Sequence, residues 1–327
     1  MFDSTDTERL RKPFVKTLNQ VFSSRSARRR YEAWFLRLGL TDRSGAWWFR
    51  YLLINPGRSG CAGNSQGQPV QVWATWFPQQ EKPRSFIQGF PLDGLQFSTK
   101  GQVPFHFQIG DNAIEEDSCR GRLKVEGHEI SWNLRYSSSF AVTLSDKGWI
   151  GFSRTPHSDA VFAGEITLDG RTFTGEPLGF GVQGHNCGYR HRNFWRWAHI
   201  YLLRLGRSTS TFEVLVYEMP LGLVFRKAVL WHEGKPYLFR NLQEISRDRQ
   251  NLRWNFRASN RNGANIEVTL DGAGFGMHRL AYLKTDCSST FEVANNSLAK
   301  ATLRFEPSHG RVEVLETVAG AVVEMAG

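Results

Sequence analysis

The amino-acid sequence predicts an all-β fold: two antiparallel, lipocalin-like barrels or curved β-sandwiches packed side by side, with a short N-terminal helix. Three observations favour it. Segments that alternate polar with β-branched or aromatic residues recur from Tyr31 onward, hairpin-type dipeptides separate several of them, and 327 residues suit about two domains. Neither half shows the strand–helix alternation of a parallel nucleotide-binding sheet, which excludes that class of fold.

The first 30 residues hold the one segment with a helical pattern. Pro13 suits a first helical turn, and the apolar residues that then share one face are Phe14, Leu18, Val21 and Phe22. A basic amphipathic helix over residues 12–22 either makes peripheral contact with a membrane or covers an open end of the protein's own sheet. We expect the strands to fold without it.

Strand-like segments fill the rest of the chain. Those quoted as they stand include AWWFRYLLIN, VQVWATWF, HEISWNLRYS, TFEVLVYEM, LRWNFRAS and ANIEVTLDG. Asp-Gly at 169–170, Glu-Gly at 233–234 and His-Gly at 309–310 sit where hairpins should turn. A glycine-rich stretch separates the two halves, so the predicted domains are 31–188 and 189–327, after a helical segment over 1–30. Barrels of about eight strands can enclose one small ligand.

The excess of 41 Lys and Arg over 31 Asp and Glu gives a net charge of +10. Much of it lies in the N-terminal segment and in residues 247–262, where basic and aromatic residues alternate. Such a pattern can bind single-stranded nucleic acid by stacking, but no RNA- or DNA-binding signature accompanies it. We therefore expect a solvated strand face and no specific nucleic-acid partner.

The cysteines and the hydropathy pattern bear on the compartment. Cys61, Cys119, Cys187 and Cys287 are far apart, with no CxxC pair, which predicts reduced thiols rather than a disulfide framework. The sequence shows no apolar run of spanning length and no secretory leader. These features predict a cytoplasmic location, with membrane association through the basic N-terminal segment left open.

The stretch GFGVQGHNCGYRHRNFWRWAHIYLL, residues 179–203, contains the candidate site. A strand from His191 places on one face His191, Asn193, Trp195, Trp197, His199 and Tyr201. Each of these side chains needs a polar partner when buried, so the face suits the wall of a pocket for a flat or long apolar molecule. A satisfied network between two packed sheets is the alternative. The tryptophans predicted to be core are Trp47, Trp48, Trp73, Trp76 and Trp132.

Metal binding and nucleophilic catalysis by a cysteine have weaker support in this stretch. His185, His191 and His199 lack the close spacing of metal ligands, and no Asp or Glu occurs between residues 177 and 212, so no metal site and no cofactor are predicted. Cys187 beside His185 could act as a nucleophile, but an ordinary buried thiol is the simpler interpretation.

The segment EITLDGRTFTGEPLGFGVQGHNCGYRHRNFWRW resembles the central motif of a two-domain lipocalin-like group. That group includes the carotenoid hydratases (hydroxyneurosporene synthases), AttH-like proteins, lipocalin-like Diels–Alderases and, more distantly, tocopherol cyclase. The residues that match its His-Asp-His-Asn-Trp-Gly and Trp-x-Trp pattern are His185, Asn186, Gly188, Trp195 and Trp197. The opening YEAWFLRLGL is similar to the group's first barrel strand, with Glu32 and Trp34 in register, and the closing VEVLETVAGAVVEMAG is similar through Gly320 and Glu324.

The resemblance implies an apolar ligand of isoprenoid, carotenoid or polyketide type and, in the hydratases, an aspartate acid beside a tyrosine. The corresponding strand here offers Glu218 next to Tyr217, and these two with His185 are the candidate catalytic residues. An arginine-paired carboxylate at a strand end is the ordinary alternative for Glu218. The candidate ligand-binding residues are Asn186, His191, Trp195, Trp197, His199, Tyr201, Trp34 and Glu32. The chain departs from the motif at Gly184, where the group has aspartate, and at Cys187, where it has tryptophan.

Two functions remain open from the sequence. The chain either binds a hydrophobic small molecule without chemistry, or acts on one as a hydratase, cyclase or isomerase without a cofactor. In both cases we expect His185, Asn186, Trp195, Trp197 and His199 to line one cavity between the barrels. The sequence does not indicate an oligomeric state.

Overall fold

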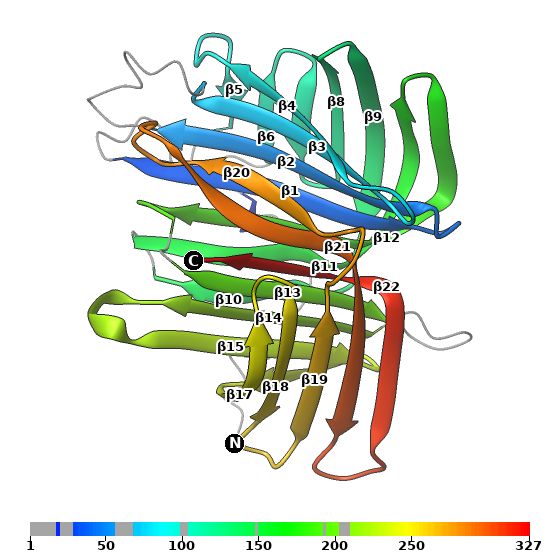
Figure 1. Ribbon diagram of the computed structural model, residues 1–327, viewed down its shortest axis with the longest axis vertical. Coiled ribbons are helices and arrows are strands. Elements are labelled where there is room, and N and C mark those ends of the chain that lie inside the picture. Colours follow the sequence, from blue (N-terminus) through cyan, green and yellow to red (C-terminus); the bar gives the residue numbers. More distant parts are fainter. Residues whose placement is uncertain are drawn as a thin grey trace.

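Two large antiparallel sheets, each curled around its own apolar core, make up the protein (Figure 1). The computed structural model describes residues 18–19, 29–55, 68–98, 104–147, 150–191, 194–202 and 210–327. The predicted all-β class is confirmed. In these ranges no helix has the length and the apolar character needed to cross a membrane.

In the N-terminal sheet the first strand in the sequence, β1, pairs with the last, β12, and this pair lies near the middle of the sheet. Its order is β4-β3-β2-β1-β12-β11-β9-β8-β7-β6-β5, with β10 paired to β11 outside this path. The strands are β1 (Arg30–Leu40), β2 (Gly45–Asn55), β3 (Val70–Pro78), β4 (Arg84–Phe90), β5 (Gln96–Phe97), β6 (His106–Ile109), β7 (Asn112–Glu115), β8 (Ser118–Val125), β9 (His128–Ser137), β10 (Val142–Asp146), β11 (Gly151–Leu168) and β12 (Arg171–Gly188).

The C-terminal sheet repeats this plan with fewer strands. Its order is β16-β15-β14-β13-β22-β21-β19-β18-β17, with β20 paired to β21 outside the path. The elements are β13 (Trp195–Leu202), β14 (Ser210–Glu218), a 3-10 turn η4 (Pro220–Gly222), β15 (Val224–His232), β16 (Lys235–Phe239), β17 (Asn241–Asp248), β18 (Arg253–Ser259), β19 (Asn265–Asp271), β20 (His278–Leu283), β21 (Thr290–Glu306) and β22 (Glu313–Ala326).

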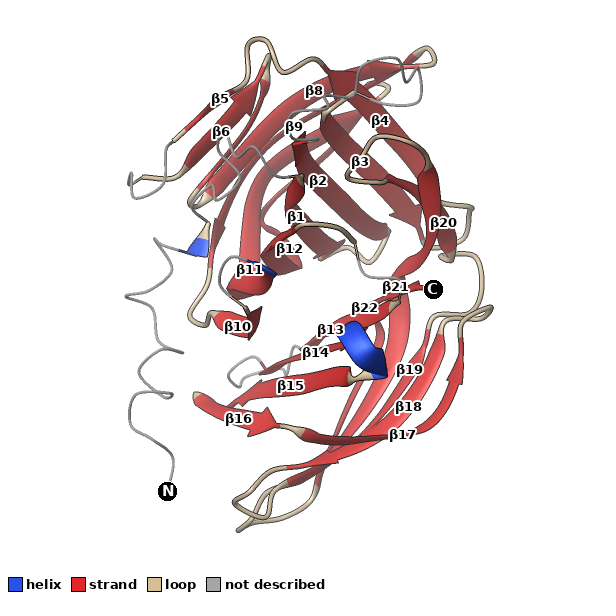
Figure 2. Ribbon diagram, turned by 90° about the vertical axis from the view of Figure 1, so that its left-hand side faces the viewer, coloured by secondary structure: helices blue, strands red, loops and turns tan. Residues whose placement is uncertain are grey.

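Each domain sends its off-path strand against the other domain. The segment leading into β10 stacks Phe140 on Trp231 of β15, with ring centroids 4.3 Å apart. In return β20 packs Leu280 and Tyr282 against Trp73 of β3. The two strands lie on opposite sides of the contact between the domains (Figure 2), so each domain covers apolar surface of the other.

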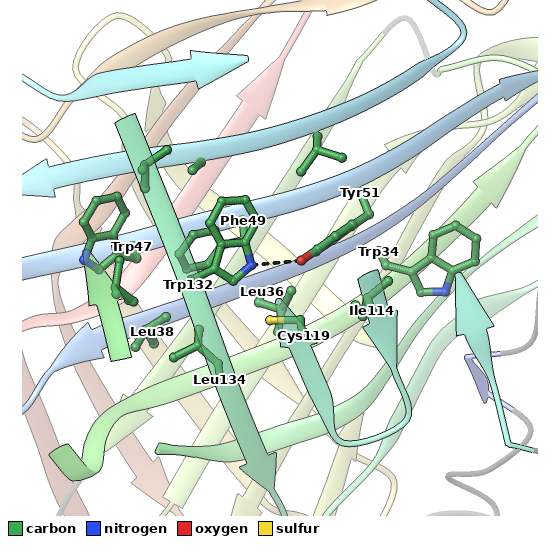
Figure 3. Packing of buried hydrophobic residues seen from close by; sticks show 14 of the residues in the cluster. Trp34, Leu36, Leu38, Trp47, Phe49, Tyr51, Ile114, Cys119, Trp132 and Leu134 are labelled. Carbon is green, nitrogen blue, oxygen red and sulfur yellow. Dashed lines mark hydrogen bonds between the residues drawn. The ribbon is translucent and has the colours of Figure 1, made fainter. Parts of the chain in front are cut away.

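Aromatic side chains dominate the interior of the N-terminal barrel, as predicted for Trp47 and Trp132. Figure 3 shows this cluster, in which the Trp132 Nε1–H donates to the Tyr51 hydroxyl at 2.9 Å. Burying rings of this size supplies much of the hydrophobic stabilisation of a domain, provided that the indole N–H and phenol O–H find partners.

Two glycines of β12 are required by close cross-strand packing. A Cβ on Gly181 would lie 1.8 Å from the Arg37 carbonyl oxygen, and one on Gly184 would lie 2.1 Å from the Phe35 ring. Any side chain at either position would therefore displace the neighbouring strand or ring. The aspartate that the resembled group has at the position of Gly184 does not fit while Phe35 occupies that space.

Arg37 of β1 fastens the two domains together. Its buried guanidinium donates to the Ser297 carbonyl, with Nη2 at 2.5 Å, and to the Ala319 carbonyl at 2.8 Å, both in the C-terminal domain. Burial lowers the pKa of Arg37 to about 10, and the side chain remains a cation held by carbonyl dipoles.

The cysteines differ from the expectation of four reduced thiols. Cys119 and Cys187 are buried and form no disulfide, but Cys287 is disulfide-bonded. Cys287 packs with Leu283 against Ala33 and Leu52 of the N-terminal domain. The prediction of a reduced Cys287 was wrong because separation in sequence does not measure the distance between thiols in a folded chain.

The helix predicted for residues 12–22 lies outside the described residues except for Leu18 and Asn19. Asn19 forms a two-way amide pair with Gln183, at 3.1 and 3.0 Å, and its carbonyl accepts from Trp34 Nε1 at 3.0 Å. These contacts lie inside the N-terminal barrel and give partners to buried polar groups. Leu18 and Asn19 thus contribute contacts to that barrel, and the expectation that the strands fold without the segment stays a prediction.

Candidate functional site

A cavity of about 290 Å³ lies between the two domains. The aromatic residues that line it from the N-terminal domain are Tyr31, Phe35, Trp48 and Phe152. Those from the C-terminal domain are Trp195, Trp197, Tyr217 and Tyr282. Both sheets therefore contribute their outer faces, and neither barrel interior forms the pocket.

Strand alternation explains why these side chains meet. In β1, Trp34 and Leu36 belong to the barrel core, whereas Phe35 points to the other domain. In β13, Ala198 belongs to the core of its own domain and Trp197 points outward to the contact between the domains. Each central strand thus carries a core face and a cavity face.

The rings in the wall contact one another in regular geometries. Trp197 meets Phe35 edge-on at 5.3 Å and Trp48 edge-on at 6.0 Å, while Phe35 stacks on Trp48 at 5.4 Å. Such contacts fix ring orientations across the domain boundary. The wall is therefore a defined aromatic surface.

Glu324 of β22 is the carboxylate of the cavity. It accepts hydrogen bonds from Trp195 Nε1 at 2.9 Å, from the Tyr282 hydroxyl at 2.9 Å and from Asn295 Nδ2 at 3.4 Å. Three donors therefore converge on one acid and hold its side chain in a fixed position. Burial and the charge of Glu324 raise the pKa of Tyr282 well above its usual 10.0, so Tyr282 remains a donor.

Several lining residues have buried polar atoms without a hydrogen-bond partner in the described part of the chain. These atoms are Trp48 Nε1, Arg50 Nη1, Asn186 Oδ1 and both ring nitrogens of His191. A buried polar group without a partner costs about 1–3 kcal/mol, and native proteins contain few of them. Five such atoms adjoin this one cavity, where a bound molecule or water would complete their contacts.

Two titratable groups at the domain boundary have shifted pKa values. Burial, with a smaller contribution from the charge of Arg50, lowers the pKa of His191 well below 6.5, so its imidazole is neutral near pH 7. Burial raises the pKa of Glu213 to about 7, although Trp197 Nε1 and Thr155 Oγ1 each donate to Glu213 Oε1 at 2.8 Å. Glu213 therefore carries a proton part of the time at neutral pH, on the far side of the Trp197 indole.

The structure brings five of the candidate site residues to the cavity: Asn186, His191, Trp195, Trp197 and Tyr217. The Tyr217 hydroxyl lies 2.8 Å from Ser145 Oγ of the other domain. Asn193, on the same predicted face, lies outside the described residues. The roles of these residues stay predictions.

Three candidates lie inside the N-terminal barrel instead. His185 is fully buried, with Nε2 2.8 Å from Glu32 Oε1 and Nδ1 2.6 Å from the Leu18 carbonyl, and it stacks on Trp34. Both of its ring nitrogens thus have partners. His185 and Asn186 are consecutive in a strand and therefore face opposite sides of the sheet.

The remaining candidates are near the cavity but do not line it. His199 and Tyr201 share the outer face of β13 with Trp197, but His199 Nε2 is bound to the Ser158 carbonyl at 2.7 Å and Tyr201 stacks on Phe180. Burial lowers the pKa of His199 to about 3. Glu218, at the end of β14, is half-buried and is not part of the wall.

Sequence reasoning did not single out Arg50, Trp48, Glu213 or Tyr282 as site residues. The period-two pattern of β2 and β14 was the available signal, since it places Trp48 with Arg50, and Glu213 with Tyr217, on one face. Glu324 was noted only as part of the closing motif. No group of three or more His, Cys, Asp or Glu residues that could hold a metal occurs among the residues described by the structure.

Comparison with known proteins supports the fold. No protein-family profile and no curated protein sequence match the chain. Among solved structures, kievitone hydratase from Nectria haematococca is similar with a TM-score of 0.55 and 9% identity, over 95% of this chain and 94% of that one. An AttH-like protein from Nitrosomonas europaea is similar with a TM-score of 0.52 and 10% identity, over 94% and 97%. At the level of fold, the resemblance to the two-domain lipocalin-like group is confirmed.

Proposed function

We propose that the protein binds an elongated apolar small molecule in the cavity between its domains. The observation that carries this proposal is the aromatic wall in which buried polar atoms of Trp48, Arg50, Asn186 and His191 have no partner among the described residues. An apolar body would contact the rings, and a few polar groups on it would complete these hydrogen bonds.

The size of the cavity narrows the class of ligand. Pockets for drug-sized molecules are typically about 300–1,000 Å³, and about 290 Å³ lies at the small end of that range. The proposal therefore favours a molecule the size of a short isoprenoid or a polyketide over a long polyene of carotenoid type.

Binding of N-phenyl-1-naphthylamine, a neutral fluorescent apolar probe, tests the proposal. Trp197→Ala should weaken its binding by about 1–3 kcal/mol, the scale of one buried aromatic contact. Trp197→Phe should recover most of the affinity, since it restores ring area without the Nε1–H bond to Glu213. Phe275→Ala, which removes an aromatic ring that is 68% exposed, is the matched control.

Equal probe affinity in the wild type and in a folded Trp195→Ala/Trp197→Ala double variant would refute the proposal, because these rings would then be structural only. Mass spectrometry of small molecules that copurify under native conditions would identify the natural class of ligand.

A hydratase- or isomerase-type reaction on the bound molecule is a second candidate, and His191 favours it. A neutral imidazole can accept a proton from water or from carbon near pH 7. The hydratase among the structural neighbours, at 9% identity, supports the idea by analogy of fold only.

Incubation of the copurified molecule with protein in ¹⁸O-labelled water tests this candidate. A hydratase yields a product heavier by one labelled water, and His191→Gln should slow that change while the probe still binds. Absence of any labelled or isomerised product in the wild type would leave binding without chemistry as the function.

A further inference from the structure

Arg50 of β2 is a buried cation that forms no ion pair with any residue the structure describes. Its side chain faces the cavity and is stacked between rings, with the guanidinium carbon 3.9 Å from the Tyr282 centroid and 5.0 Å from the Trp73 centroid. The residue is only 4% exposed, and within the described ranges it makes no ion pair and its Nη1 has no acceptor. The two rings hold the guanidinium plane and leave its N–H edge available.

Two other buried arginines of this chain show what such a group ordinarily contacts. Arg196, also stacked on an indole, donates to the Glu244 carboxylate at 3.0 Å. Arg37 donates to the carbonyls of Ser297 and Ala319. A buried guanidinium without any acceptor is costly, so the contrast indicates that the acceptor for Arg50 is a separate molecule.

Among the described residues around Arg50, none supplies that acceptor. Glu324, the carboxylate of the cavity, is already bonded to Trp195, Tyr282 and Asn295. Trp48, two residues from Arg50 on the same strand face, adds a second unpartnered N–H. Two unpartnered donors, one of them charged, therefore lie on one strand face that lines the cavity.

We propose that Arg50, assisted by the Trp48 N–H, binds an anionic oxygen group on the apolar ligand, so that the substrate class is apolar acids carrying a carboxylate or an equivalent anion. This inference rests on the proposed binding function. Asn186 Oδ1 and the His191 ring are left to pair with hydroxyl groups elsewhere on the ligand. Because Arg50 is held by Trp73 of one domain and Tyr282 of the other, the anion site exists only in the docked protein.

Two probes that share one carbon skeleton separate the anion site from the apolar pocket. N-Phenyl-1-naphthylamine is neutral, and 8-anilinonaphthalene-1-sulfonate adds one sulfonate as a stand-in for the carboxylate. Arg50→Met should weaken binding of the sulfonate probe by at least about tenfold and change binding of the neutral probe by less than about threefold. Arg50→Lys keeps the charge but loses the planar guanidinium, so its affinity for the sulfonate probe should lie between those of the wild type and Arg50→Met.

Arg257→Met is the control, since it removes the same charge from an exposed site on β18 and should affect neither probe. Near-ultraviolet circular dichroism establishes that each variant is folded, and if Arg50→Met does not fold, the comparison is made with Arg50→Lys. An equal loss for both probes, or unchanged sulfonate affinity, overturns the anion site and leaves the apolar pocket intact. Failure of the wild type to bind the neutral probe overturns the binding function, and this inference with it.

Discussion

The two domains share one strand plan, but two sets of buried polar side chains, one from each domain, lie in different surroundings. The first set lies inside the N-terminal barrel, where His185 and Gln183 are paired with Glu32, Leu18 and Asn19. The second set lies on the outer face of the C-terminal domain and includes Trp195, Trp197, His199, Glu213 and Glu324. Both sets have partners within the chain, but the second surrounds a cavity whose unpartnered atoms belong to Trp48, Arg50, Asn186 and His191. The comparison teaches that the first set completes a core, whereas the second frames a space in which a ligand would complete the open contacts.

The largest effect is expected at the boundary, where Arg37 of one domain binds carbonyls of the other. Arg37→Ala should lower the free energy of unfolding by about 2–5 kcal/mol, because the Ser297 and Ala319 carbonyls lose their donor and a void remains. Urea unfolding measures it, with the exposed Arg257→Ala as control. A loss within about 0.5 kcal/mol of that control would show that the domains are held by apolar contacts alone.

The outer face of the C-terminal domain should make stability depend on pH through Glu213. Its pKa of about 7 in the folded protein exceeds the usual 4.5, so the folded state retains this proton more firmly than the unfolded state. The resulting stabilisation is fully present below about pH 4.5 and is lost as pH rises through about 7, a difference of up to about 3 kcal/mol. Glu213→Gln should flatten this part of the profile.

Urea unfolding between pH 5 and 8 measures the profile, and Glu218→Gln, at the half-buried end of the same strand, is the control. If the free energy of unfolding depends on pH identically in the wild type and in Glu213→Gln, the Glu213 carboxyl is ionised throughout this range. The pH dependence would then not distinguish the outer face of the C-terminal domain.

Inside the N-terminal barrel, Asn19→Ala should cost about 1–3 kcal/mol, since the buried Gln183 amide loses both of its Asn19 bonds. Amide hydrogen exchange should accelerate in β1 and β12 and stay unchanged in β13 and β22. Asn265→Ala, at an exposed position, is the control. Equal acceleration in both domains would show that residues 18–19 stabilise the whole assembly and not one barrel.

The smallest effect is expected where β10 meets the C-terminal domain. Lys227 Nζ donates to the Thr143 carbonyl at 2.7 Å in a partly buried contact, so Lys227→Met should cost about 1 kcal/mol or less. Amide exchange in β10 should be faster in Lys227→Met than in the control Lys235→Met, which changes an exposed lysine. A loss of stability as large as that expected for Arg37→Ala would show that the β10 contact holds the two domains together as strongly as Arg37 does.

The sequence predicted the all-β class and the outward face of β13 because both depend on local alternation. Trp195 and Trp197 reach the cavity as expected from period two. The same rule separates His185 from Asn186, and grouping them in one cavity ignored that consecutive strand residues point apart. Arg50 and Glu324 could not be assigned in advance, since they become neighbours only through strand order and the docking of β20, which involve contacts between distant segments.

The reciprocal packing of β10 and β20 has a consequence for synthesis on the ribosome. Trp73 is made about 200 residues before Leu280 and Tyr282, the residues that cover it, which corresponds to roughly 10–40 s of translation. During that interval the nascent N-terminal domain presents an aromatic sheet face to the cell. We expect chaperones to bind this face, and translation arrest before β20 to yield an aggregation-prone product.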